Sequence, residues 1–201
     1  MSFGVVFKCF TTMSILFYEP EKPFYEFSNF FGTHTKGIKK RGGFKLRIDG
    51  LDWISTEHYF QAQKFYIPDS PRHMEYYNII HKADSPMKVT ILGRQKCRGG
   101  YAAKWVVAKS SDERTLNDVI REYADVQIRS DWDTVRDDVM MTALMAKFTQ
   151  NDYLKKILLD TGDVEIVEDS PRDSYWGWGK DKKGLNMLGK TLMKVRETLK
   201  K

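Results

Sequence analysis

The sequence predicts an α+β fold, a predominantly helical single domain with a small antiparallel β-sheet. Apolar residues recur at helical spacing in most segments, whereas strand-like alternation is short. No internal repeat and no Pro/Gly/Ser-rich linker divides the 201 residues, of which 41% are hydrophobic. We expect a short leader over residues 1–14, with Met13 as an alternative start, and one domain over residues 15–201.

Strands are predicted at 15–18, at 44–48 with a turn at Asp49-Gly50 and a return strand near Trp53, and at 164–168. Helices are predicted at 57–66, 72–83, 86–92, 112–123, 134–149, 153–160 and 187–199. Ser70-Pro71 and Ser85-Pro86 combine a capping oxygen with a proline at the first helical position.

Composition narrows the class of protein. The net charge of +6 is spread along the chain in short clusters, which is typical of solvated loops and also allows anionic substrates. Two cysteines, Cys9 and Cys97, are too few for a disulfide framework or a thiolate zinc site. No run approaches the length of a membrane span. We therefore expect a cytoplasmic protein without a membrane association.

The segment Ser55-Thr56-Glu57-His58-Tyr59-Phe60-Gln61-Ala62-Gln63-Lys64-Phe65 is the first candidate site. Ser55 or Thr56 is a plausible N-cap, so Glu57 falls in the first turn, where the helix dipole favours a carboxylate. Glu57, Gln61 and Lys64 share one helix face and can converge on one ligand. The alternative, which the pattern alone favours, is an exposed amphipathic helix whose Glu57 stabilises its own N-terminus.

The second candidate is the segment Ser170-Pro171-Arg172-Asp173-Ser174-Tyr175-Trp176-Gly177-Trp178-Gly179. Large rings beside a carboxylate can hold Asp173 near a sugar hydroxyl or a hydrolytic water, with Trp176 as an aromatic wall. The alternative is a turn in which Asp173 bonds its own backbone and Trp176 fills the core. Paired carboxylates and stacking rings suit a hydrolase that cleaves a sugar from a flat base.

Other candidates carry weaker signals. Arg94 can direct a guanidinium at a phosphate, and Asn29 can bind a base edge or satisfy a turn. Lys147 and Arg136 project from a long helix, where surface pairs are the simplest interpretation. The four histidines show no metal-ligand spacing, and no phosphate-binding or dinucleotide glycine motif is present. We expect no metal and no tightly held cofactor.

The two candidate segments, taken with shorter motifs in order along the chain, resemble the YbiA-like, or NADAR, family of N-glycosidases. The resemblance covers nearly the whole chain after about Ile15. Besides Glu57-His58-Tyr59-Phe60-Gln61-Ala62-Gln63-Lys64-Phe65, the matching motifs lie at 17–18, 27–30, 92–94, 132, 145–148, 158–162, 168–173, 176–177, 184–189 and 192–196.

The resemblance implies hydrolysis of an N-glycosidic bond, including that of phosphoribosylamino-pyrimidine intermediates of riboflavin synthesis. It implies catalytic roles for Glu57, Asp173 and Trp176. It also implies substrate binding by the following residues: Asn29, Lys64, Arg94, Trp132 and Lys147. The expected partner is a small phosphorylated N-glycoside, with no obligate protein partner.

Two segments depart from the compact bacterial pattern, a basic excursion at 36–44 and a longer connection at 97–111. Both can reshape the mouth of a pocket and so affect substrate identity. Two other functions therefore stay open. One is removal of ADP-ribose from modified guanine in nucleic acid, and the other is binding of NAD or ADP-ribose without cleavage.

Overall fold

The computed structural model describes residues 14–94 and 116–201 of the chain, and helices dominate the fold. Two predicted helices are confirmed to the residue, α3 (Pro86–Leu92) and α8 (Met187–Leu199). The others differ from the predicted ends by a few residues: α1 (Thr56–Gln63), α2 (Pro71–Lys82), α5 (Leu116–Glu122), α6 (Trp132–Thr149) and α7 (Asp152–Asp160). The predicted start of α5, at 112–115, lies outside the described residues.

Within residues 14–94 and 116–201, the strands form two separate pairs, one parallel and one antiparallel, rather than the single antiparallel sheet that was predicted. β2 (Arg47–Ile48) and β3 (Leu51–Asp52) form the expected antiparallel hairpin, with Asp49 and Gly50 both at positive φ. β1 (Ile15–Phe17) pairs with β4 (Ile166–Glu168) in parallel. Because most of the chain lies between these two strands, the connection is long enough to return in the same direction.

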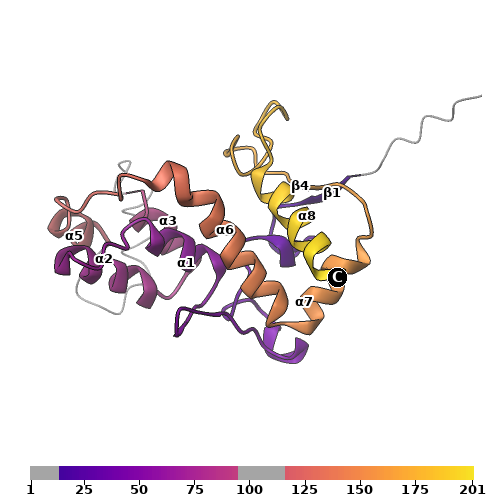
Figure 1. Cartoon of the computed structure of the whole chain (residues 1–201), viewed down its shortest axis with the longest axis horizontal. Coiled ribbons are helices and arrows are strands. Elements are labelled where there is room, and N and C mark those ends of the chain that lie inside the picture. The colour runs from indigo at the N-terminus through magenta and orange to yellow at the C-terminus, as the bar shows by residue number, and fades with distance from the viewer. Residues whose placement is uncertain (1–13, 95–115) are drawn as a thin grey trace, which may run out of the picture.

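Helix α6 joins two groups of elements (Figure 1). Helices α1, α2, α3 and α5 lie at one end of the molecule, whereas β1, β4, α7 and α8 lie at the other. Each group has its own apolar cluster. Phe65, Tyr76 and Ile80 belong to the first cluster, and Phe17, Leu154 and Leu192 to the second. The face of α1 that carries Phe60 contributes to the second cluster, so this helix lies where the two groups meet.

The basic excursion contains a short 3-10 helix, η2 (Ile38–Arg41), which is anchored in the fold. Ile38 is buried in the second cluster, and Arg41 forms an ion pair with Glu26. The ring of Phe44 packs edge-on against Phe31, with ring centroids 6.1 Å apart. The excursion at 97–111 lies outside the described residues.

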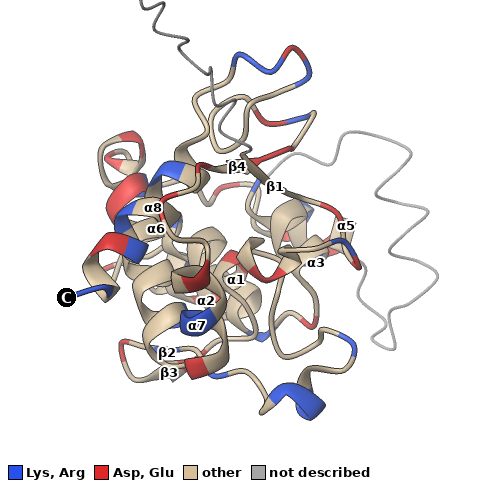
Figure 2. Cartoon of the chain, turned by 90° about the vertical axis from the view of Figure 1, so that its right-hand side faces the viewer, with Lys and Arg blue, Asp and Glu red and all other residues tan. Residues whose placement is uncertain are grey.

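Charges of both signs are interspersed over the surface (Figure 2). Several belong to pairs close in sequence, such as Lys88 with Asp84 and Lys156 with Asp160. Exposed pairs of this kind contribute little to stability. Among the described helices, none combines the length and the apolar character that crossing a bilayer requires.

Candidate active site

The start of α1 is fixed by its N-cap residue, Ser55, and by the buried His58. Ser55, in extended backbone conformation, accepts a hydrogen bond from the backbone N–H of His58 (3.4 Å), and its hydroxyl bonds His58 Nδ1 (2.8 Å). His58 Nε2 lies 3.0 Å from the carbonyl oxygen of Ala83. Burial lowers the pKa of His58 to about 4, so the imidazole is neutral and holds the helix end in place.

Glu57 lies in this first turn with only 7% of its surface exposed. Its Oε1 lies 2.8 Å from each of two donors, Gln61 Nε2 and Thr90 Oγ1. The single proton of the Thr90 hydroxyl has a second acceptor in the carbonyl oxygen of Pro86, 2.9 Å away. These donors hold the carboxylate in one orientation and stabilise its negative charge, and Oε2 makes no hydrogen bond to the described residues. Every residue of α1 is buried, so the interpretation of this segment as an exposed amphipathic helix is wrong.

Asn29 positions the same turn from the outside of the helix. Its backbone carbonyl accepts from the N–H of Glu57 (3.1 Å), and its Oδ1 accepts from Thr56 Oγ1 (2.9 Å). The side-chain oxygen is thus engaged within the protein. Asn29 therefore satisfies the start of α1, and only its amide N–H groups are left to donate to a ligand.

Lys64, one turn after Gln61, is surrounded by aromatic rings. Its Nζ lies 5.5 Å from the ring centroid of Phe60 and 5.8 Å from that of Trp132. The same Nζ donates to the carbonyl oxygen of Gly93 (3.4 Å). Trp132 is buried at the first position of α6 and packs on Phe60, so it forms the aromatic floor beneath the ammonium group.

The charges around Lys64 show which candidates share one neighbourhood. The pKa of Lys64 is lowered to about 8, chiefly by burial and in smaller part by the positive charge of Arg94, while Glu57 and Asp173 oppose this shift. Residues from α1, from the end of α3 and from the loop after β4 therefore act on one ammonium group. The structure thus brings Glu57, Lys64, Arg94 and Asp173 into one neighbourhood.

Asp173 forms the turn that the alternative interpretation proposed. Its Oδ1 accepts from the backbone N–H groups of Tyr175 (2.9 Å) and Trp176 (2.8 Å). Trp176 packs edge-to-face on Phe60, with ring centroids 5.3 Å apart, at the margin of the core. The turn uses only Oδ1 of the Asp173 carboxylate. The contact of Trp176 with Phe60 holds the loop against α1.

Glu168 is a site residue that the sequence analysis missed. It ends β4, and its Oε2 is buried without a hydrogen-bond partner in the described part of the chain. Burial, followed by the negative charges of Asp173 and Glu57, raises the pKa of Glu168 to about 8. A signal was present, because strand alternation puts Glu168 on the same face as the buried Ile166.

Lys147 corrects another interpretation, since it forms no surface pair. Its side chain is 0% exposed, and Nζ donates to the carbonyl oxygen of Ser28 (2.9 Å) between the rings of Phe31 and Phe148. Burial lowers its pKa to about 7. The structure places Lys147 behind the site, where it holds the backbone next to Asn29.

The burial of Lys147 predicts how stability depends on pH. In the folded protein its pKa is about 7, whereas an unfolded lysine keeps 10.5, so the unfolded chain binds more protons between these values. The contribution of Lys147 to stability therefore rises with pH. Relative to Lys147→Met, the unfolding free energy of the wild type should gain up to about 1.4 kcal/mol per pH unit above neutrality.

Urea unfolding of both proteins at pH 7 and pH 9 measures this difference. Lys190→Met, at an exposed position of α8, serves as the control and should unfold in parallel with the wild type. An equal pH dependence for wild type and Lys147→Met would contradict the buried-lysine account.

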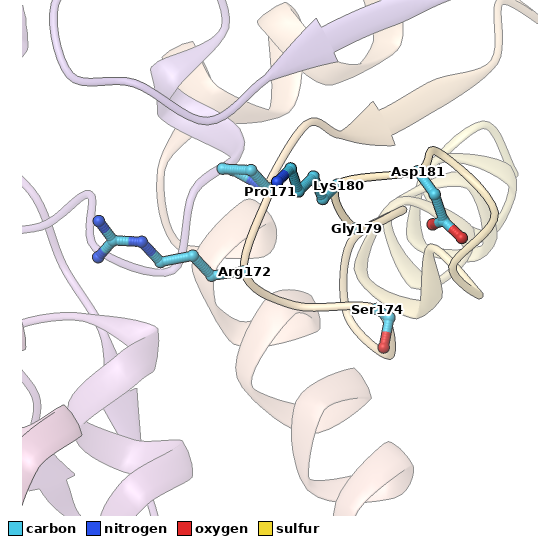
Figure 3. A pocket seen from close by; sticks show the side chains of 6 residues that line it. All are labelled: Pro171, Arg172, Ser174, Gly179, Lys180 and Asp181. Carbon is cyan, nitrogen blue, oxygen red and sulfur yellow. The ribbon is translucent and has the colours of Figure 1, made fainter. Parts of the chain in front are cut away.

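The loop after β4 borders a shallow hollow of about 480 Å³ that is open to solvent (Figure 3). Pro171, Ser174, Gly179, Lys180 and Asp181 line it, while the side chain of Arg172 extends away from the other lining residues. This hollow adjoins Asp173 in the chain but does not include Glu57. Among the described residues, no group of three His, Cys, Asp or Glu has the arrangement of a metal site.

The sequence model of the NADAR domain family matches residues 16–200 of this chain. The chain is 35% identical over 188 residues to the N-glycosidase Npun_R5314 of Nostoc punctiforme, covering 94% of both chains. It is 31% identical over 185 residues to the N-glycosidase YbiA of Escherichia coli, covering 92% of this chain and 88% of that one. The NMR structure of YbiA superimposes with a TM-score of 0.66 over 94% of this chain and 86% of that chain.

The chain belongs to the NADAR family. Within that family it groups with the YbiA-like N-glycosidases, and the mostly helical domain with small sheets is the fold shared with YbiA. A further relative, the chloroplastic riboflavin biosynthesis protein PYRR of Zea mays, is 30% identical over 190 residues, which are 94% of this chain and 26% of that protein.

Proposed function

We propose that this protein hydrolyses the C–N glycosidic bond of phosphoribosylamino-pyrimidine intermediates, releasing ribose 5-phosphate and the free base. The single observation that carries the proposal is the double hydrogen bond that fixes Oε1 of Glu57 beside Lys64 and Asp173. Relatives with riboflavin biosynthesis in their names, from Zea mays and Vibrio vulnificus, support the choice of substrate.

The first step of the proposed mechanism is loosening of the bond between C1 of the ribose and the nitrogen of the base. Positive charge then develops on the sugar ring, and a carboxylate close to that ring stabilises it. Glu57 suits this role because its orientation is set by Gln61 and Thr90 before the substrate binds. Its second oxygen orients the water that adds to C1 and accepts the proton of that water.

Binding of the substrate is assigned to the groups around Glu57. Lys64 and Arg94 neutralise the phosphate, and the second oxygen of Asp173 holds the ribose hydroxyls. Trp176 stacks on the base or the sugar, with the orientation of its ring set by Phe60. Lys64 loses its charge as the pH rises through about 8, so phosphate binding weakens on the alkaline side.

The test is incubation of the purified protein with a phosphoribosylamino-pyrimidine and measurement of free ribose 5-phosphate. Release above the rate of spontaneous hydrolysis supports the proposal. No release by the folded protein would contradict it. Two parallel incubations separate the other functions: an oligonucleotide with ADP-ribosylated guanine tests release of ADP-ribose, and calorimetry with ADP-ribose tests binding without cleavage.

Asp173→Asn separates the turn from the chemistry. The amide oxygen of the introduced asparagine can accept the same two backbone N–H bonds, so the loop should keep its conformation while its negative charge is lost. We expect a loss of catalytic efficiency of about 10²-fold or more, with an unfolding free energy close to that of the wild type.

Steady-state release of ribose 5-phosphate and urea unfolding are the two measurements for this variant. Asp181→Asn, in the same loop and exposed, is the matched control. If Asp173→Asn turns over at the wild-type rate, Asp173 serves only the turn.

A further inference from the structure

Glu168 is a carboxyl group at this site that the proposed mechanism leaves unused. It is half-buried at the end of β4, and its Oε2 is enclosed without a hydrogen-bond partner among the described residues. A buried carboxylate without a partner is costly, whereas a neutral carboxylic acid at the same place is much less so. The position therefore favours a group that carries a proton.

The backbone of Glu168 is held on three sides, which fixes the point on β4 from which the side chain leaves. Its N–H donates to Asn186 Oδ1 (3.0 Å), and its carbonyl oxygen accepts from the N–H of Trp178 (3.2 Å). In the parallel pair its Cα lies opposite Phe17. The backbone at this residue therefore has little freedom to move.

The charged groups that face Glu168 reinforce its protonation. Asp173, from the loop after β4, and Glu57, from α1, both act on it with negative charge. Lys64 supplies positive charge, which acts on Glu57 and Asp173. Three ionised carboxylates beside the ammonium group of Lys64 and the guanidinium of Arg94 would leave an excess of negative charge, and a neutral Glu168 removes that excess.

We propose that Glu168 is the general acid of this site, which donates a proton to the nitrogen of the departing base. The proposal rests on the function proposed above, because the anion of an amino-pyrimidine is a poor leaving group, whereas the protonated nitrogen departs as a neutral amine. With Glu57 ionised and Glu168 protonated, the site holds two carboxyl groups with opposite tasks.

The step balances in atoms and electrons. The C1–N bond breaks, and its electron pair passes to the nitrogen, which takes the proton from the Glu168 carboxyl group. The oxygen of the water bonds to C1, and the released proton passes to the Glu57 carboxylate. The products are ribose 5-phosphate and the amine, and exchange with solvent restores both carboxyl groups.

Glu168→Gln tests the proposal, because glutamine has the shape of the protonated acid but cannot donate a proton of that acidity. Glu165→Gln is the matched control, since Glu165 is exposed on the same segment and its carboxylate accepts a hydrogen bond from Ser14. We expect Glu168→Gln to fold and to lose roughly 10²–10⁴-fold in kcat, with Glu165→Gln unchanged.

The pH profile of kcat separates proton donation from positioning. In the wild type kcat should fall as the pH rises through about 8, and this alkaline limb should be absent from Glu168→Gln. Lys64 titrates in the same range, but its proposed role is phosphate binding, so its titration changes KM and not kcat at saturating substrate. Wild-type turnover of Glu168→Gln, or a slow variant with an unchanged limb, overturns the assignment.

Infrared spectroscopy provides a readout that needs no substrate. The carbonyl stretch of a protonated carboxyl group should be present in the wild type at pH 7, fade as the pH rises through about 8, and be missing from Glu168→Gln. If the wild type releases no ribose 5-phosphate, the function proposed above fails while this band still reports on Glu168. If the band is absent from the wild type at pH 7, the assignment of Glu168 as the general acid is wrong, even where hydrolysis is observed.

Discussion

Glu57→Gln should leave the fold intact and reduce kcat by roughly 10²–10⁴-fold, the range expected for loss of a group that acts on the transition state. Glutamine has the size of glutamate, and its oxygen can accept the same hydrogen bonds from Gln61 and Thr90. What it removes is the negative charge that would face the developing cation and accept the proton of the water.

Release of ribose 5-phosphate at saturating substrate, together with urea unfolding, measures both parts of this result. Glu75→Gln is the matched control, because its carboxylate is 60% exposed on α2, where it pairs with Arg72 and accepts a long hydrogen bond from the Tyr123 hydroxyl. Turnover of Glu57→Gln at the wild-type rate would remove Glu57 from the mechanism. A large loss of stability would instead mean that the charge holds the fold.

Gly189→Ala adds a single methyl group and should lower the free energy of unfolding by about 3 kcal/mol or more, the largest loss of stability among these predictions. Gly189 lies where α8 crosses β4, and a Cβ there would meet the carbonyl oxygen of Ile166 at 2.1 Å and Asn186 Oδ1 at 2.5 Å. The first of these atoms is backbone in a paired strand and cannot swing aside. Because β4 carries Glu168, activity should fall with stability.

Helix propensity alone would make Gly189→Ala stabilising, so the clash and the propensity predict changes of opposite sign. Alanine is favoured over glycine inside a helix by about 1 kcal/mol, so an unhindered site would be stabilised. Lys190→Ala, at the next and exposed position of α8, is the control for a change without a clash. Thermal or urea unfolding decides, and a Gly189→Ala variant as stable as the wild type would contradict the close contact.

Helices were predictable from the sequence where local signals act alone. The bounds of α3 follow from Ser85, which caps the helix through a bond from the N–H of Lys88, and from Pro86. The bounds of α8 follow from its apolar spacing. The pairing of β1 with β4 was not predictable, because parallel pairing between distant strands leaves no mark on the short runs of residues involved.

The site was predictable in part, for a similar reason. Glu57 and Lys64 lie on one helix face, so their spacing places them together. The inward position of Glu168 depends on what packs over β4, and the contribution of Thr90 depends on how α3 lies against α1. The burial of Lys147 was not predictable, because its position in the helix does not show that its ammonium group donates to the carbonyl oxygen of Ser28.

The parallel pair of β1 and β4 also decides when the protein can work during its synthesis. Ile15 lies opposite Ile166, so β1 leaves the ribosome well before the strand with which it pairs. Helix α1 can fold early, with its capped turn, but β4, which bears Glu168, and α8, which packs on it, are made much later. A nascent chain therefore lacks Glu168, Asp173 and Trp176, three of the groups proposed to act in the reaction, until the segment after α7 has been made.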